Sequence, residues 1–206
     1  MYKKYIKRCL DIILSLIGIL ILSPVYIVLA VAVLFGMGWP IIFCQDRVGK
    51  DEKIFKFYKF RSMTNARDTN GNMLDESQRL TKFGKFIRST SIDELPEIFL
   101  ILFGKMSIIG PRPLPAYYLP YYKENEHKRH LVRGGLIPAD TLSGEPTPSW
   151  DKQLEYDVYY AENCSFILDI KVLTQTAKVL YLRAISDYGA AERPHLSKER
   201  AYMKKN

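Results

Sequence analysis

The sequence lacks the usual devices by which proteins bind phosphate or activate water. It contains no GxxxxGK[ST] loop, no GxSxG elbow and no HExxH pair, and its Gly36-x-Gly38 stands in apolar sequence. Zinc-finger spacing and an RNP-like aromatic signature are also missing, so nucleic acid is not an expected partner. Any bound phosphate must therefore be held by side chains or by a metal ion.

Cysteine and histidine are scarce. Cys9, Cys44 and Cys164 are odd in number and far apart, which argues against a disulfide framework. His127 and His130 have a spacing that is compatible with metal binding, but they lie in the charged run KENEHKRH without a nearby cysteine. This context favours a solvated helix face over a metal site.

Charged residues are missing from one long segment, which runs from Ile12 through Gln45 without Asp, Glu, Lys, Arg or His. A signal peptide has a shorter apolar core, and cleavage after Ala32 would leave an apolar N-terminus. The segment therefore belongs in a membrane. An ordinary spanning helix and a re-entrant helix are the two forms that it could take.

Ser23 and Pro24 divide this apolar segment into two short arms, each about half as long as the hydrocarbon core is thick. Pro24 removes the amide that would bond the carbonyl of Leu20, and the Ser23 hydroxyl is placed to compensate. Basic residues flank both ends, which favours one cytoplasmic side for both. These residues are Lys3, Lys4, Lys7 and Arg8 before the run, and Arg47, Lys50, Lys53 and Lys56 after it.

We therefore predict a re-entrant helix-break-helix over residues 1–45 and a cytoplasmic domain over residues 46–206. The expected fold class is α+β: a small, mostly helical domain with a short β-hairpin and interfacial amphipathic helices. The net charge of +8 suits an anionic phospholipid surface or phosphate-bearing substrates. The hairpin is expected in residues 41–63, with an exposed loop over residues 64–77.

Further along, a helix is expected to start near Thr90 or Ser91, with Pro96 in its first turns and Asp93 close to its N-terminus. The tyrosine-rich residues 116–130 suit either a bilayer interface or packing on the domain. A helix over residues 165–185 carries an apolar stripe that predicts core packing. That stripe comprises Ile167, Ile170, Leu173, Ala177 and Leu180. The charged C-terminus from Leu196 is expected to be loosely held.

Four basic residues are candidates for binding phosphate: Lys59, Arg61, Arg88 and Arg112. Pro111 and Pro113 stiffen the turn around Arg112 and limit the conformational loss on binding. Solvated surface charge is the alternative for each of them.

Asp93 and Glu94 form an acidic pair. A carboxylate can attack phosphorus and so split one displacement into two, if cations such as Mg²⁺ and arginine shield the meeting anions. Acidic residues at a helix start are otherwise simple partners of the helix dipole.

Several linked motifs carry a resemblance to a known family. RSTSIDELPEIFLILFGKMSIIGPRP, with KFRSM before it and LEYDVYYAENCSFILDI after it, resembles the bacterial polyprenyl-phosphate sugar phosphotransferases, the monotopic phosphoglycosyl transferases. The resemblance covers nearly the whole chain, including the Ser-Pro break. The short length resembles the members that act in bacterial N-linked protein glycosylation.

The resemblance implies that Asp93 is the nucleophile of a phosphosugar intermediate, with Mg²⁺ beside it and Glu94 in support. Lys59, Arg88 and Arg112 would bind substrate phosphates. The implied substrates are undecaprenyl phosphate and a UDP-sugar, such as the N-acetylated amino sugar UDP-diacetylbacillosamine. The implied location is the bacterial inner membrane, with the active site on the cytoplasmic face and later glycosyltransferases of the pathway as partners.

The sequence differs from the family pattern at two places, and two other functional hypotheses remain open. Lys105 and Ile101 replace an acid and an Asn that relatives often carry, and residues 134–150 differ from larger relatives, so the determinants of sugar choice are expected there. One rival is a non-catalytic membrane-anchored protein that binds lipid or a partner. The other is a one-step transfer in which the acidic pair serves as base and metal ligand.

Overall fold

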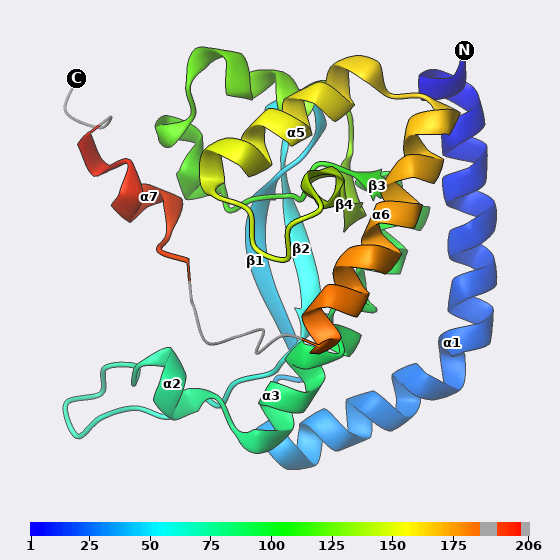
Figure 1. Ribbon diagram of the computed structural model, residues 1–206. Helices are drawn as coiled ribbons and strands as arrows, with labels where there is room; N and C mark the ends of the chain where they lie inside the picture. The colour runs from blue at the N-terminus through cyan, green and yellow to red at the C-terminus, as the bar shows by residue number, and fades with distance from the viewer. Residues whose placement is uncertain (186–192, 203–206) are drawn as a thin grey trace.

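The computed structural model describes residues 1–185 and 193–202 and combines helices with two small sheets (Figure 1). The α-helices are α1 (Lys7–Met37), α2 (Glu76–Arg79), α3 (Lys82–Ser89), α4 (Glu97–Leu102), α5 (Trp150–Asn163), α6 (Phe166–Ile185) and α7 (Leu196–Glu199). The strands are β1 (Ile42–Val48), β2 (Ile54–Phe60), β3 (Met106–Gly110) and β4 (Gly134–Pro138). A π-helical turn, η1 (Tyr2–Ile6), precedes α1, and the 3-10 segments are η2 (Lys50–Glu52), η3 (Ile92–Glu94), η4 (Ala116–Tyr121), η5 (Glu124–Leu131) and η6 (Ala139–Ser143).

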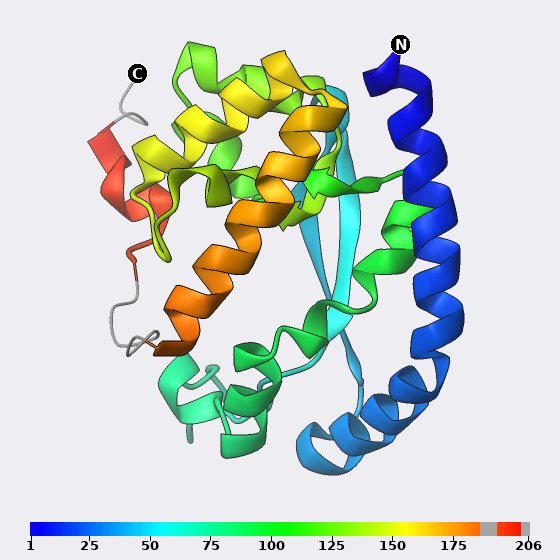
Figure 2. The same cartoon turned by 45° about the vertical axis from the view of Figure 1, so that its right-hand side comes forward.

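Helix α1 runs along one side of the domain and bends in its middle, so that its second half turns beneath the domain (Figures 1 and 2). Pro24 lies inside the helix, and the Ser23 hydroxyl donates to the carbonyl of Leu20 over 2.9 Å. The predicted compensation at the Ser-Pro pair is confirmed. Many large apolar side chains of α1 face outward, among them Ile13, Ile17 and Leu20.

Within the described residues, one helical stretch, Tyr2–Met37, is long and apolar enough to cross a membrane by length and composition. Only 11% of its most apolar window is buried inside the structure, which distinguishes it from the core helix of a soluble domain. An apolar N-terminal membrane anchor is therefore supported.

Polar contacts hold the first half of α1 against the domain. The Arg8 guanidinium donates to the carbonyls of Ile101 and Leu102, and the amide of Ile108 donates to the Asp11 carboxylate over 2.9 Å. The second half packs through Leu29, Val33 and Met37 into a cluster with Phe60 and Ile87. Both halves of α1 therefore contact the domain.

Strands β1 and β2 form the predicted antiparallel hairpin, with Ile42 opposite Phe60 and Val48 opposite Ile54. The predicted boundary at residue 45 falls inside β1, so the hairpin joins the two predicted units. Phe55 and Phe57 point into the domain against Leu100, Ile101 and Met106. Because side chains alternate along a strand, Lys59 lies on this same inward face.

The parallel pair of β3 and β4 is not predictable from local sequence pattern. Met106 lies opposite Gly134, and Ile109 opposite Ile137, although the strands are far apart in the chain. A Cβ added at Gly135 would lie 2.0 Å from the amide nitrogen of Gly110, so glycine permits this close approach.

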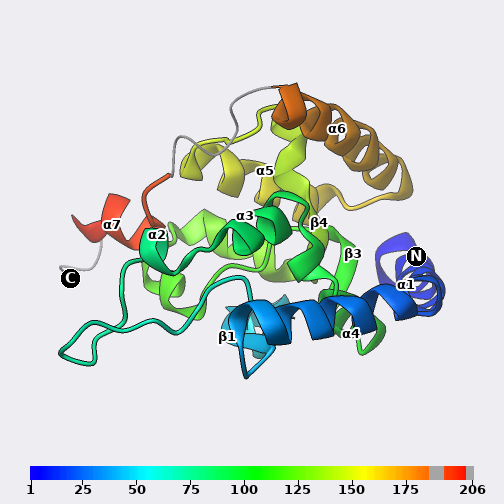
Figure 3. The same cartoon turned by 90° about the horizontal axis from the view of Figure 1, so that it is seen from below.

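The prediction for the apolar stripe of α6 is wrong. Ile167 is 80% exposed and Leu180 is 55% exposed, and the other three stripe residues are exposed as well. The helix instead buries Leu168, Val172 and Val179, which form a second stripe at helical spacing. Figure 3 shows the start of α6 near the N-terminal end of α1, where the Lys7 ammonium lies 2.7 Å from the Asp169 carboxylate. Helix α6 has two apolar faces with helical spacing. Periodicity alone does not show which of the two is buried, and the packing of the domain decides it.

In the tyrosine-rich segment, packing on the domain is confirmed for Tyr118, Tyr121 and Tyr122, which are buried in a cluster with Trp150 and Leu154. These tyrosines are therefore not free to lie in a bilayer interface, which corrects that part of the predicted fold.

The solvated-face interpretation of the following charged run is also wrong in part. Glu126, Arg129 and His130 are buried there, since the run packs on α5 and acquires buried partners. The C-terminus is likewise less loosely held than expected, because Leu196 is fully buried and Arg200 is only 3% exposed.

Candidate active site

Asp93 lies on a short turn between two helices. Helix α3 ends at Ser89, Ser91 adopts a left-handed conformation with φ of 55°, and the 3-10 turn η3 then carries Asp93 and Glu94. The expected single helix from Thr90 or Ser91 is thus replaced by this turn, and α4 begins only after Pro96, which is its N-cap. Proline lacks an amide for an intrahelical bond, so a helix start is favoured just there.

The Asp93 carboxyl is buried and faces a lysine. Asp93 is only 4% exposed, and its Oδ2 lies 3.7 Å from Nζ of Lys59 at the inward-facing end of β2. Burial raises the pKa of Asp93 above its ordinary range, and the nearby Glu94 adds to this shift, whereas Lys59 opposes it. Burial also lowers the pKa of Lys59. The site therefore contains an incompletely compensated carboxyl in a desolvated position.

Glu94 pairs with Arg112, which lies in the Pro-Arg-Pro turn after β3. The carbonyl of Arg112 accepts a hydrogen bond of 2.7 Å from the Arg129 guanidinium, which fixes the turn from behind. The Arg112 side chain is 44% exposed, so its guanidinium can meet a ligand as well as Glu94. Glu94 in turn holds the pKa of Arg112 above its ordinary value.

Arg88 and Arg61 differ in how their guanidinium groups are bonded within the protein. The Arg88 Nε donates to the Ser62 hydroxyl over 3.0 Å, and its charge acts on both Asp93 and Lys59. The Arg61 side chain is buried, and its Nε and Nη1 donate to the carbonyls of Met63 and Pro40. Arg61 thus supports the chain after β2, and its role in substrate binding stays a prediction.

Sequence reasoning missed two further charged residues of this site, Glu97 and Arg47. Glu97 is 3% exposed, its charge interacts with Glu94 and Arg112, and its Oε1 has no hydrogen-bond partner in the described chain. Arg47 donates to the carbonyl of Pro113 over 3.0 Å and lies 4.9 Å from the centre of the Phe57 ring. One sequence feature could have identified Glu97 as a site residue: it is an acid about one helical turn after Asp93 in an otherwise apolar helix.

The buried Glu97 predicts a specific dependence of stability on pH. Burial, with a contribution from Glu94, raises the pKa of Glu97 to about 9 from an ordinary value of 4.5. Between these values the native state keeps a proton that the unfolded state has released, so the free energy of unfolding falls as pH rises. The variant Glu97→Gln cannot ionise and removes this dependence.

In EDTA, the stability of Glu97→Gln relative to the unchanged protein is expected to grow from about pH 5 to about pH 9, by at most about 1.4 kcal/mol per pH unit. Thermal unfolding midpoints at several pH values measure this difference. The exposed Glu124→Gln is the matched control. Parallel pH curves for the unchanged protein and Glu97→Gln would show that Glu97 ionises normally.

The acidic residues of this site fit a hard divalent cation. Mg²⁺ binds proteins through one or two carboxylates together with substrate phosphates. Asp93 supplies one buried carboxyl, and the orphaned Oε1 of Glu97 is a second oxygen acceptor, near which Glu94 adds negative charge and Arg112, Arg47 and Lys59 add positive charge.

Comparison with known proteins identifies the family. Residues 2–183 match the family described as bacterial sugar transferase. The chain is 40% identical over 196 residues to the uncharacterized sugar transferase EpsL of Bacillus subtilis, and the alignment covers 95% of each protein. The chain belongs to the bacterial sugar transferase family, so the family predicted from the linked motifs is confirmed.

Two longer relatives carry more specific names. The chain is 37% identical over 181 residues to the UDP-glucose:undecaprenyl-phosphate glucose-1-phosphate transferase of Klebsiella pneumoniae, covering 82% of this chain and 39% of that protein. It is 36% identical over 188 residues to the UDP-N-acetylgalactosamine-undecaprenyl-phosphate N-acetylgalactosaminephosphotransferase of Aeromonas hydrophila, covering 85% of this chain and 44% of that protein. This chain spans less than half the length of these two relatives.

Proposed function

We propose that this chain transfers a sugar 1-phosphate from a UDP-sugar to undecaprenyl phosphate and releases UMP, with Asp93 as the nucleophile. The observation that carries the proposal is the buried Asp93 carboxyl, 3.7 Å from Lys59, in a member of the bacterial sugar transferase family. The names of the longer relatives support the same class of donor and acceptor.

In the first step, an Asp93 oxygen forms a bond to the β-phosphorus of the UDP-sugar, and the bond from that phosphorus to the bridging oxygen breaks. UMP leaves with the electron pair. In the second step, an oxygen of undecaprenyl phosphate attacks the same phosphorus, and the Asp93 carboxylate is released. The lipid product carries the sugar through a diphosphate, and the enzyme returns to its starting state.

The basic residues have distinct roles in this proposal. Lys59 and Arg88 lower the repulsion between the Asp93 carboxylate and the incoming phosphate, because their charges act on Asp93. Arg112 presents its half-exposed guanidinium to phosphate oxygens, and Glu94 orients it. Bound Mg²⁺, held by Asp93 with Glu97 as a further oxygen donor, would supply charge neutralisation at the phosphate oxygens.

A membrane position follows from the acceptor, which is a lipid. The outward apolar side chains of α1 suit insertion into the hydrocarbon, and the basic flanks suit an anionic phospholipid surface. We propose a re-entrant α1 in the inner membrane, with the active site on the cytoplasmic face. The reaction would be the first membrane step of glycoconjugate or N-glycan assembly, followed by later glycosyltransferases.

The sugar is proposed to be an N-acetylated amino sugar such as diacetylbacillosamine, on the basis of the resemblance of the linked motifs to the phosphoglycosyl transferases and of the N-acetylated amino sugar in the name of the Aeromonas hydrophila relative. Residues 134–150, which differ from larger relatives, would contribute to this choice. A panel of UDP-sugars supplied with undecaprenyl phosphate and Mg²⁺ tests it, and UMP release reports which donor is used.

The decisive experiment omits the lipid acceptor. The protein is incubated with the accepted UDP-sugar and Mg²⁺, and its intact mass is measured. A mass increase equal to one sugar phosphate is expected, and Asp93→Asn should lack it. Protein that turns over with lipid but never carries the adduct would contradict the two-step route and favour the one-step rival. Absence of turnover with every donor and acceptor would favour the non-catalytic rival.

Two natural thiols test the membrane topology. Cys9 and Cys44 are both exposed; Cys9 lies near the start of α1, and Cys44 lies in β1, after α1 has ended. If α1 is re-entrant, a membrane-impermeant maleimide should label both from the same face of the membrane. Variants that keep one of the two thiols, on a Cys164→Ser background, are compared in right-side-out and inverted vesicles. Labelling of the two thiols from opposite faces would show a spanning helix.

A further inference from the structure

Glu52, His127 and His130 come together outside the proposed active site. Glu52 lies in η2, at the turn of the β1–β2 hairpin, and both histidines lie in η5. The Oε1 of Glu52 is 2.5 Å from Nδ1 of His127 and 3.4 Å from Nδ1 of His130. One ligand atom from each residue falls within 4.8 Å of the other two.

We propose that these three side chains form a binding site for a divalent transition-metal ion, and that Zn²⁺ is the ion that fits it. Zinc sites are tetrahedral, and bonds of about 2.0–2.1 Å place neighbouring ligand atoms about 3.3 Å apart. The separation of Glu52 and His130 already has this value. The shorter contact between Glu52 and His127 is a hydrogen bond that an ion would replace, and rotation of the half-exposed Glu52 side chain can lengthen it.

The state of His130 points to a ligand. His130 is only 5% exposed, yet its Nε2 has no polar partner among residues 1–185 and 193–202, and its Nδ1 has only the Glu52 carboxylate 3.4 Å away. A buried polar group without a partner is costly, so such a group calls for an explanation. A buried imidazole that has an unused ring nitrogen and lies beside a carboxylate is suited to metal binding.

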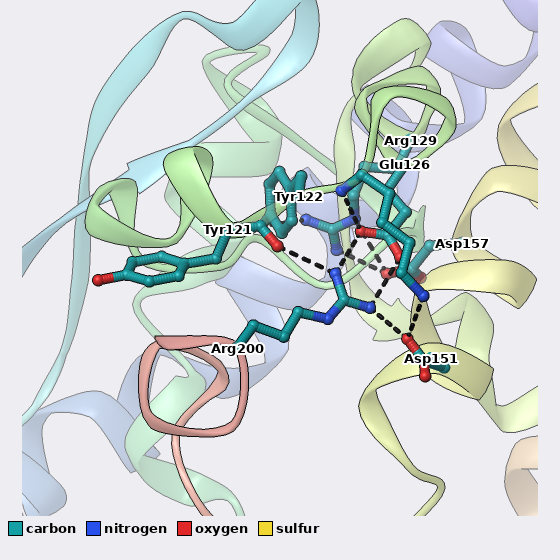
Figure 4. Close-up of polar contacts among 8 residues, drawn as sticks. Tyr121, Tyr122, Glu126, Arg129, Asp151, Asp157 and Arg200 are labelled. Atoms are coloured by element: carbon teal, nitrogen blue, oxygen red, sulfur yellow. Dashed lines mark hydrogen bonds and ion pairs between the residues drawn. The ribbon is translucent and has the colours of Figure 1, made fainter. Parts of the chain in front are cut away.

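The basic residues between the two histidines do not exclude a cation. Lys128 pairs with Glu162 over 3.0 Å, and Arg129 pairs with Asp157 over 2.6 Å. Both acids lie on α5, on the far side of η5 from the hairpin turn, and Figure 4 shows the Arg129–Asp157 pair. Tyr122 packs its ring against both histidines, with ring centres 5.7 Å apart in each case. The histidine rings are thus ordered, and the adjacent charges are balanced.

The donor set separates this site from a Mg²⁺ site. Two imidazole nitrogens and one carboxylate oxygen suit zinc and its neighbours, whereas Mg²⁺ prefers oxygen ligands. Three protein ligands leave the fourth position open to water, and an open, half-exposed site exchanges its ion. A bound ion would tie the hairpin turn to η5, whose Arg129 holds the carbonyl of Arg112. Metal binding should therefore stabilise η5, the segment that holds the Pro-Arg-Pro turn after β3.

The test uses the full chain in nanodiscs, with polyhistidine tags removed from both the chain and the scaffold protein. Metal is stripped with EDTA and dialysed away, and Zn²⁺ is titrated in competition with a chromophoric chelator. We expect one Zn²⁺ per chain, and affinity at least about tenfold weaker in His127→Gln and in Glu52→Gln. His195→Gln changes the third histidine of the sequence, which is exposed and contacts Tyr118, and is the matched control.

Two further measurements do not depend on activity. Co²⁺ should give the intense visible bands of tetrahedral coordination in the unchanged protein and lose them in His127→Gln. At about a hundredfold excess over Kd, Zn²⁺ should raise the unfolding midpoint by about 5 °C or more, and Asp93→Asn should leave this shift unchanged. Equal affinity in His127→Gln and the unchanged protein would overturn the proposal, as would the absence of saturable binding.

Discussion

Replacing Asp93 with asparagine is expected to lower the rate of sugar-phosphate transfer by at least about a thousandfold, because an amide cannot form the aspartyl phosphate. The fold should persist, since asparagine has nearly the same shape and its introduction removes a charge from a position that is 4% exposed. Release of UMP from the accepted UDP-sugar, with undecaprenyl phosphate and Mg²⁺ present, measures the rate.

The matched control for this variant is Asp75→Asn. Asp75 is exposed and precedes α2 without donating or accepting a side-chain cap bond in the described structure. It should keep the rate of the unchanged protein. Turnover of Asp93→Asn within about tenfold of normal, in protein with an unchanged unfolding midpoint, would remove Asp93 from the role of nucleophile.

The largest expected loss of stability follows from breaking the buried pair between Arg129 and Asp157. The two side chains are 1% and 0% exposed, and their closest atoms are 2.6 Å apart (Figure 4). Asp157→Asn keeps the shape but leaves the Arg129 charge buried without its counter-charge. A loss of about 3–5 kcal/mol is expected, because an uncompensated buried charge is costly.

Denaturant unfolding in nanodiscs at about pH 8.5 measures this loss. Burial raises the pKa of Asp157 to about 7 despite the attraction of Arg129, so the carboxyl is ionised at that pH. Glu162→Gln is the matched control, because Glu162 pairs with Lys128 across the same two segments, η5 and α5, but at the surface. It should lose no more than about 1 kcal/mol.

The double variant Arg129→Met with Asp157→Leu should recover much of the stability lost in Asp157→Asn, since two apolar side chains need no counter-charge. An effect of Asp157→Asn no larger than that of Glu162→Gln would show that the buried pair contributes no more than a surface pair.

Local features of this protein could be predicted because their causes are local. Three features depend only on nearby residues or on the alternation of side chains along a strand. They are the absence of charge from Ile12 through Gln45, the Ser23 bond to Leu20 and the β-hairpin. The candidate residues Asp93, Glu94 and Arg112 could be selected because they stand in linked motifs. The structure pairs Glu94 with Arg112, and the roles of these residues stay predictions.

Other features depend on which faces of the helices and loops pack against each other. The hydrophobic periodicity of the sequence does not determine that packing. Helix α6 has two apolar stripes, and its contacts bury Leu168 and Val172 rather than Ile167 and Ile170. His130 stands in a charged run, yet it is buried where η5 meets the hairpin turn. Glu97 looks like an ordinary acid in the first turn of a helix, and its raised pKa arises from burial beside Glu94.

The amino-acid sequence by itself determined that this chain has an apolar N-terminal segment with Ser23-Pro24 in its middle, a basic character and an acidic pair within a family motif. Hydropathy, backbone chemistry and motif order are properties of consecutive residues, so they need no folded context. Only the tertiary structure brought Lys59 to Asp93, Arg129 behind Arg112, and Glu52 to the two histidines. These contacts join segments that are distant in the chain, and desolvation at the junctions shifts the pKa values that no local pattern records.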